Sequence, residues 1–355
     1  MTQPPENHQQ PGGHFNAQPG QQAFRAPGEP LPQDLSAGWL PEDERQKPVS
    51  PLPQPKLFAY QSMLPPKVLH ALRHPSEIPW LVAAYAVTAV GYIVLFMALA
   101  DLFSSMMRYV FSSTGEGSVR VPSSGSTSAS LEDLIFQTVG LLILGPIAVF
   151  IVRAVYYAQQ RVHGVRITPT QFPEAYQMLA EAAEAAGLRR VPDAYVILGN
   201  GTMNAFAAGH GFRRYICLYS DLFEIGGKSR DPQALRFIIG HEVGHIAAGH
   251  VGYFRLIFTT LFNQIPVLSS ALSRSQEYTA DNFGYRFCPE GAEGAVKVLA
   301  AGKYLNKQVN FDELADRAVT DRGLAVWYVN LLASHPILTW RAHALRDRTQ
   351  PGRLF

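Results

Sequence analysis

The chain has 355 residues and a formal net charge of +2 at pH 7; 47% of its residues are hydrophobic and 16% are charged. The length allows one sizeable domain with additional segments, and the charged fraction is low for a soluble protein. No dense run of Lys or Arg occurs, so nothing indicates nucleic acid as a partner. Two cysteines, Cys217 and Cys288, are too few for a disulfide framework and fit a reducing compartment; a single disulfide bond between them is the alternative.

Residues 1–75 are predicted to form a disordered or polyproline-like tail. They contain 15 of the 26 prolines, together with many Gln residues and little hydrophobic periodicity. The run Pro51-Leu52-Pro53-Gln54-Pro55 could recruit a partner, whose identity the sequence does not reveal, or it could be a solvated spacer. No basic segment followed by an apolar core opens the chain, so no cleaved signal peptide is expected.

Two apolar stretches without charged residues follow, at residues 80–100 and 134–152. Each has roughly the 20 residues that a helix needs to cross the hydrocarbon core of a bilayer. We therefore expect a transmembrane hairpin over residues 76–160, with the Ser- and Gly-rich residues 112–130 as its loop, and the lipid bilayer as a partner. Two buried helices of a soluble protein are the alternative.

Basic residues near the two spans favour one orientation, because Lys and Arg accumulate on the cytoplasmic side of membrane proteins. We expect a multi-pass protein of the cell (inner) membrane, with the tail and the C-terminal domain in the cytoplasm. The basic residues on that side are Lys67, Arg73, Arg153, Arg161 and Arg166, against Arg108 and Arg120 on the other.

Residues 161–347 are predicted to form an α+β domain that is mainly helical, followed by a solvated basic tail at residues 348–355. A small sheet precedes the longer helices, and Gly209-His210-Gly211 is a hairpin signal within it. Strands are predicted at residues 165–168, 194–198, 204–208 and 214–219, and helices at residues 173–186, 232–250, 290–305 and 311–332.

The segment His241-Glu242-Val243-Gly244-His245 has the spacing H-E-x-x-H. On a helix, the two imidazoles lie one turn apart on the same face and can both reach one metal ion, while Glu242 is rotated to the side. A zinc ion lowers the pKa of water, and the neighbouring carboxylate can accept the proton. The motif therefore predicts a metallopeptidase site with one zinc ion per chain, although it would occur by chance in about one chain in a hundred of this length.

The third metal ligand decides the type of site. The extended pattern H-E-x-x-H-x-x-G-x-x-H is absent, and His250 lies one residue out of its register, so His250 is expected to be a packing or helix-end residue. Glu277 would complete a site of two His and one Glu, and Asp281, one turn later on a helix, could orient an imidazole. Taken alone, these two acids could equally form a solvated face.

The apolar residues 256–273 lie between the proposed ligands His245 and Glu277. One membrane crossing there would separate the ligands of a single ion, and two crossings need roughly 40 residues plus a turn, more than the chain between the ligands provides. The break at Asn263-Gln264-Ile265-Pro266 instead predicts a short helical hairpin that dips into the membrane interface or packs on the domain.

Four motifs in this order resemble the HtpX-like membrane zinc metallopeptidases, which are relatives of the CAAX prenyl proteases. The resemblance covers roughly residues 165–347 and implies a zincin-like (gluzincin) domain. The motifs are Asn204-Ala205-Phe206-Ala207, the HExxH segment, Ser273-Arg274 with Glu277-x-x-Ala280-Asp281, and Ser334-His335-Pro336 with Arg341.

The resemblance also implies roles for the flanking motifs. The residues Asn204, Ala205, Phe206 and Ala207 would form an edge strand that binds an extended substrate as an added strand. His335 would stabilise the oxyanion formed during attack, and Arg341 could pair with a site carboxylate such as Asp281. An ordinary sheet edge and surface His and Arg side chains are the alternatives.

Together, these inferences predict a membrane-anchored zinc endopeptidase with Glu242 as general base. By resemblance, its substrates would be membrane or misfolded polypeptides and its role protein quality control. The alternative is a catalytically inactive membrane scaffold that keeps the fold and gathers partners through the Pro-rich tail. A serine hydrolase is disfavoured, because the chain contains no G-x-S-x-G sequence.

Overall fold

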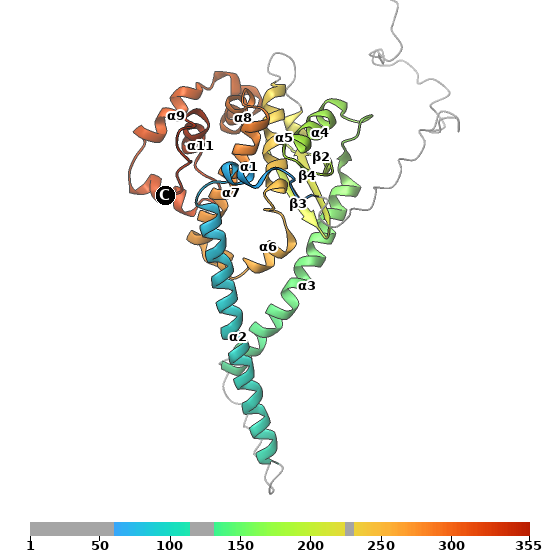
Figure 1. The fold of residues 1–355 in the computed structure, drawn as a ribbon, viewed down its shortest axis with the longest axis vertical. Helices are drawn as coiled ribbons and strands as arrows, with labels where there is room; N and C mark the ends of the chain where they lie inside the picture. Colours follow the sequence, from blue (N-terminus) through green and yellow to red (C-terminus); the bar gives the residue numbers. More distant parts are fainter. Residues whose placement is uncertain (1–59, 114–130, 224–230) are drawn as a thin grey trace, which may run out of the picture. The chain divides into compact units, whose positions relative to one another are not determined.

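The computed structural model describes residues 60–113, 131–223 and 231–355 (Figure 1). The expected disorder of residues 1–59 and most of the expected loop at residues 112–130 lie outside the described residues. The described part is mainly helical with one small sheet, which confirms the predicted α+β class.

Four strands form a mixed sheet in the order β1-β2-β4-β3. β1 (Val165–Arg166) pairs antiparallel with β2 (Asp193–Ile197), β2 is parallel to β4 (Arg213–Tyr219), and β3 (Ala205–His210) is antiparallel to β4. The predicted strands are all present, with β1 shorter than expected. β3 is thus an edge strand, and it contacts helix α5 (Pro232–Ala247); both are labelled in Figure 1.

Helix α5 begins at a polar cap and runs through the centre of the domain. The Asp231 side chain accepts a 2.9 Å hydrogen bond from the backbone N–H of Ala234, which satisfies one of the free amides of the first turn, and Pro232 occupies a position where no N–H is needed. Ile239 and Val243 of α5 are fully buried against the sheet and helix α4 (Pro173–Ala185). α5 is therefore buried on most of its sides.

Glycines allow α5 to approach α7 (Pro266–Phe287) closely. A Cβ at Gly244 would lie 2.6 Å from Cβ of Phe283, and a Cβ at Gly240 would lie 2.8 Å from Cδ1 of Phe287. Any side chain at either position would push the helices apart. Because the HExxH motif is on α5 and the downstream acids are on α7, this contact brings the two halves of the predicted site together.

The remaining elements are mostly helices that follow α7 in the chain and contact α5, α7 or one another. The predicted helix at residues 311–332 is divided in two by Gly323, whose φ of 132° is not helical. The elements are η2 (Ser220–Leu222), α8 (Gly291–Leu305), η5 (Asn306–Gln308), α9 (Phe311–Thr320), α10 (Leu324–Leu332) and α11 (Leu338–Arg346).

The tail predicted to extend to residue 75 ends earlier. Tyr60 is buried in the main core, the Ser62 hydroxyl donates a 2.7 Å hydrogen bond to the Ala186 carbonyl, and helix α1 (Pro66–Leu72) follows. The prediction is wrong for residues 60–75 because a high proline content is typical of disorder, whereas Pro65 and Pro66 here start a helix.

The predicted solvated C-terminal tail is also wrong. Leu354 is buried, and its carbonyl accepts hydrogen bonds from Arg274 and Asn330. Arg348 donates to the Asn282 side chain at 2.6 Å and lies over the ring of Tyr285. The segment is polar in composition, but the buried side chain of Leu354 and the hydrogen bonds to its carbonyl group attach it to the domain.

Helices α2 (Glu77–Ser113) and α3 (Leu131–His163) contain the two predicted spans and contact each other. Within the described residues one candidate span is found, Glu77–Ser105, and only 11% of its most apolar stretch is buried. In the second predicted span, the side chains of residues 134–139 and 141–143 lie outside the described ones, so the hairpin stays a prediction.

The apolar run at residues 256–273 is a folded connection. Helix α6 (Tyr253–Phe258) and η4 (Phe262–Gln264) precede Pro266, at which α7 begins. Phe262 is buried in a small cluster with Ala84 of α2 and Leu272 of α7. The run therefore packs on the domain beside α2, one of the two predicted arrangements.

Candidate metal centre

Three potential ligand atoms converge where α5 faces α7. His241, His245 and Glu277 each offer one atom, and these atoms lie within 4.8 Å of one another. The two Nε2 atoms are 3.2 Å apart, and each is 3.5 Å from a different carboxylate oxygen of Glu277. The structure thus brings together the three residues that the sequence predicts as metal ligands.

These separations fit zinc. Four ligands arranged as a tetrahedron around zinc, with bonds of about 2.0–2.1 Å, lie about 3.3 Å from each other. The 3.2 Å between the two Nε2 atoms is close to that edge length, and each Nε2 has one Glu277 oxygen at 3.5 Å. Two imidazoles and one carboxylate leave a fourth position open, the composition typical of a catalytic rather than a structural zinc site.

Asp281 and Arg341 support one of the imidazoles. Asp281 Oδ1 lies 2.8 Å from His241 Nδ1, on the side of the ring opposite to Glu277. Arg341 donates to both oxygens of the same carboxylate, at 2.8 and 2.6 Å. An imidazole whose Nδ1–H donates to Asp281 keeps the lone pair of Nε2 free for a metal ion.

The charges around His241 favour a cation. Burial disfavours a charged imidazole, but hydrogen bonds to Asp281 and Glu277 outweigh it and raise the pKa of His241 to about 9. Burial also opposes ionisation of Glu277, yet its contacts with His241 and His245 hold its pKa well below the ordinary value. A bound metal ion can supply the positive charge that a proton on His241 otherwise provides beside these carboxylates.

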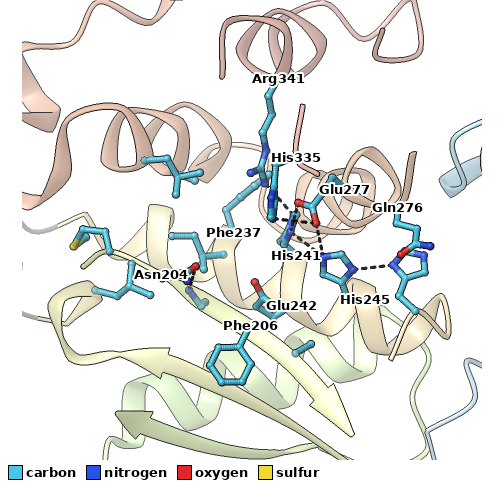
Figure 2. A pocket seen from close by; sticks show the side chains of 18 of the residues that line it. Asn204, Phe206, Phe237, His241, Glu242, His245, Gln276, Glu277, His335 and Arg341 are labelled. Carbon is cyan, nitrogen blue, oxygen red and sulfur yellow. Dashed lines mark hydrogen bonds and ion pairs between the residues drawn. The ribbon is translucent and has the colours of Figure 1, made fainter. Parts of the chain in front are cut away.

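Glu242 lies in the cleft beside the imidazoles. It follows His241 on α5 and is therefore rotated by about 100° around the helix axis. In Figure 2 its carboxylate lies on the side of the imidazoles that faces Phe206 of β3. Burial raises the pKa of Glu242, which makes the carboxylate a better proton acceptor at neutral pH.

His335 lies at the mouth of the same cleft, on the segment between α10 and α11. Its Nε2 is 3.5 Å from Glu277 Oε1, and 66% of its side chain is exposed. Arg274, which is fully buried, donates to the carbonyls of Asn330 and Ala333 at 2.6 and 2.7 Å. These bonds fix the segment that carries His335, so a buried Arg of α7 positions an exposed His.

The cleft has a volume of about 340 Å³ and is bounded on one side by the edge strand β3. All four predicted substrate-binding residues, Asn204, Ala205, Phe206 and Ala207, line it. The Asn204 carbonyl accepts a bond from the Tyr219 amide of β4. In an antiparallel pair such groups alternate along the strand, so the amide and carbonyl of Ala207 point away from β4.

Sequence reasoning missed the role of His250. The prediction of a packing or helix-end residue does not include its polar contacts: its Nδ1 lies 2.8 Å from Nδ1 of His245, and its Nε2 lies 3.1 Å from the buried carboxylate of Glu77. Burial lowers the pKa of His250 to about 3, so the ring is neutral. The spacing of five residues from His245 is a local signal, but nothing in the sequence joins either to Glu77.

Comparisons with known proteins agree with this geometry. Residues 169–264 and 252–349, together just over half of the chain, match the sequence model of peptidase family M48. The chain is also 26% identical to the metalloprotease YcaL of Escherichia coli (strain K12) over 196 residues, 49% of this chain and 70% of that protein. No solved structure matches the chain significantly. The resemblance to HtpX-like metallopeptidases is thereby confirmed, and the chain belongs to peptidase family M48, a family of metalloproteases.

Proposed function

We propose that this metalloprotease is a membrane-anchored zinc endopeptidase of the gluzincin type, with His241, His245 and Glu277 as ligands and Glu242 as general base. The observation that carries the proposal is the convergence of the three ligand atoms at separations close to the edge of a zinc tetrahedron. The buried Asp281–Arg341 pair behind His241 supports it, because chance clusters of surface acids lack such a second layer.

The side chains of the cleft divide the work of peptide hydrolysis. A bound zinc ion would act as a Lewis acid and would lower the pKa of water. Glu242 accepts a proton from the attacking water and later delivers it to the nitrogen of the leaving amine. His335 can donate a hydrogen bond to the oxygen that becomes negative as the carbonyl is attacked, and its exposure lets it approach a bound peptide.

Strand β3 is the proposed substrate platform. An extended peptide can pair with the outward amide and carbonyl of Ala207 as a further strand of the sheet. Binding through the backbone tolerates many side chains, which suits unfolded segments of membrane or misfolded proteins. This is the basis on which we propose protein quality control as the physiological role.

The candidate span in α2 supports a membrane anchor. Its apolar side chains are exposed rather than packed in the domain, as for Val82, Val90, Val94, Phe96 and Met97. A cell (inner) membrane location with a cytoplasmic catalytic domain is the proposed arrangement. A multi-pass topology requires that α3 also crosses the membrane.

Zinc analysis and proteolysis of the purified full chain test the proposal together. The protein extracted in detergent should contain one zinc ion per chain and cleave an unfolded polypeptide, and a chelator should abolish cleavage. Glu242→Gln should keep the zinc and lose cleavage, because Gln has nearly the same shape but cannot accept the proton.

Gln276→Asn is a matched control, since Gln276 also lines the cleft without a proposed chemical role. Full proteolysis by Glu242→Gln would overturn the mechanism. A protein that binds zinc but cleaves no polypeptide would instead favour the inactive scaffold.

A further inference from the structure

Glu77, the first residue of α2, is completely buried in a cluster of polar groups. Its Oε1 lies 3.1 Å from His250 Nε2 and 3.2 Å from Arg255 Nη2, and it also contacts Arg73. Its Oε2 accepts a 2.6 Å hydrogen bond from the Thr279 hydroxyl. Each neighbour compensates for part of the cost of burying the carboxylate, and the neighbours come from α6, α7 and the segments before α2 and after α5.

The hydrogen-bond directions between Glu77 and the metal centre follow from one constraint. His245 must keep Nε2 without a proton to bind a metal, because that atom faces His241 and Glu277. Its proton is then on Nδ1, which donates to Nδ1 of His250 over 2.8 Å. His250 consequently carries its own proton on Nε2 and donates it to Glu77.

We propose that Glu77 and His250 are positioning residues for the metal ligand His245. The carboxylate fixes the tautomer and orientation of His250, and His250 fixes those of His245. Each ligand imidazole thus has its own carboxylate, since Asp281 contacts His241 directly and Glu77 reaches His245 through one intervening ring. The inference rests on the proposed function only in requiring that the centre binds a metal.

The geometry couples the metal centre to the candidate membrane helix. Arg73, four residues before Glu77, donates to the Ala248 carbonyl at 2.7 Å, and Arg153 of α3 donates to the Val251 carbonyl at 2.9 Å. Both bonds hold the short segment that carries His250. The base of α2 therefore forms part of the support of His245, and metal affinity depends on the docking of that helix.

Zinc affinity of the full chain in detergent tests this inference. Metal-free protein is titrated with zinc in competition with a chromophoric chelator, and the Co²⁺-substituted protein is compared by its visible absorption spectrum. Glu77→Gln keeps the volume of the side chain but removes its charge. Since loss of such a partner typically weakens metal binding about 10- to 100-fold, we expect an increase of that size in the zinc Kd and a shifted cobalt spectrum.

A double-mutant cycle separates positioning from general stability. His250→Phe should raise the zinc Kd to a similar degree, and Glu77→Gln in that background should add less than about twofold, because the link between them is already lost. Thr279→Val is the matched control: it removes the hydrogen bond to the other oxygen of Glu77 and should lower the melting temperature but leave the zinc Kd within about twofold.

Several outcomes overturn the inference. A folded Glu77→Gln protein with wild-type zinc affinity does so, as does a double mutant whose loss is the product of the two single losses. Should Glu77→Gln not fold, His250→Phe decides alone, since it leaves Glu77 paired with its arginines, and an unchanged zinc Kd in that variant refutes the link. If the wild-type chain binds no zinc, both this inference and the proposed function fail.

Discussion

Asp281 Oδ1 and His241 Nδ1 lie 2.8 Å apart although 40 residues separate them in the chain. The contact depends on the close crossing of α5 and α7 at Gly240 and Gly244. Asp281 also holds the buried guanidinium of Arg341, 60 residues further on. One carboxylate therefore orients a proposed metal ligand and neutralises a buried cation.

Asp281→Asn should weaken metal binding and destabilise the fold. The amide can still accept a hydrogen bond but no longer neutralises Arg341, and an uncompensated buried charge costs about 3–5 kcal/mol. We expect the zinc Kd to rise about 10- to 100-fold, measured by chelator competition. Asp312→Asn, an exposed partner of Arg346, is the control and should change neither quantity appreciably.

The local features of the fold could be predicted from the sequence. Hydrophobic periodicity and Gly or Pro signals gave the four strands, α4 and α5 to within a few residues, and helical spacing placed His241 and His245 on one face. Glu277 followed from the need for a third ligand and from the motif resemblance. These features depend on short stretches of chain, which sequence patterns describe well.

The contacts between distant segments could not be predicted. Glu77 lies 173 residues from His250 and stands at the edge of an apolar run, so its burial against a neutral imidazole has no local signal. The predicted orientation treats Arg73 and Arg153 as charges near the membrane spans, but both donate hydrogen bonds to carbonyls of the domain. Such pairings arise from tertiary packing, which composition does not encode.

Replacing His335 should separate catalysis from metal binding. His335→Ala removes a donor to the developing oxyanion, and loss of one such donor typically lowers kcat about 10²- to 10³-fold. KM and zinc content should change little, because three ligands remain. Leu324→Ala, at an exposed position of the neighbouring helix α10, is the control and should keep both kcat and the zinc content. Loss of zinc in His335→Ala would contradict this role and make His335 a ligand.

His74 should make the fold sensitive to mild acid. The Ser76 amide donates to its Nδ1 at 3.2 Å, while its Nε2 lies 2.8 Å from the Gly352 carbonyl, so the folded site accommodates the neutral ring. Burial lowers the pKa of His74, and the hydrogen bond to Gly352 and the attraction of Glu77 only partly oppose this. Below about pH 6.5 the unfolded chain binds a proton that the folded chain does not. The free energy of unfolding therefore decreases as the pH is lowered from about 6.5 to the pKa of His74 in the folded protein.

The His74→Gln variant tests this effect, because Gln can still donate to Gly352 but does not titrate. Melting temperatures at pH 7.5 and 5.5, with chelator present to exclude metal loss, should differ less in the variant than in the wild type. A single group of this kind contributes at most about 1.4 kcal/mol per pH unit. His70→Gln, on the exposed side of α1, is the control. Equal pH responses of His74→Gln and wild type would show that His74 titrates alike in both states.

Strand β3 should lose substrate binding when a single outward amide is removed. Ala207→Pro deletes the N–H that points away from β4, and an edge strand tolerates proline at such a position. One hydrogen bond contributes about 0.5–1.5 kcal/mol, so kcat/KM for an extended peptide should fall about two- to 13-fold, with little change in melting temperature. Ala208→Pro is the matched control: its N–H faces β4, so this variant should chiefly destabilise the sheet. If Ala207→Pro cleaves the peptide as well as the wild type does, the substrate does not bind by strand addition at this edge.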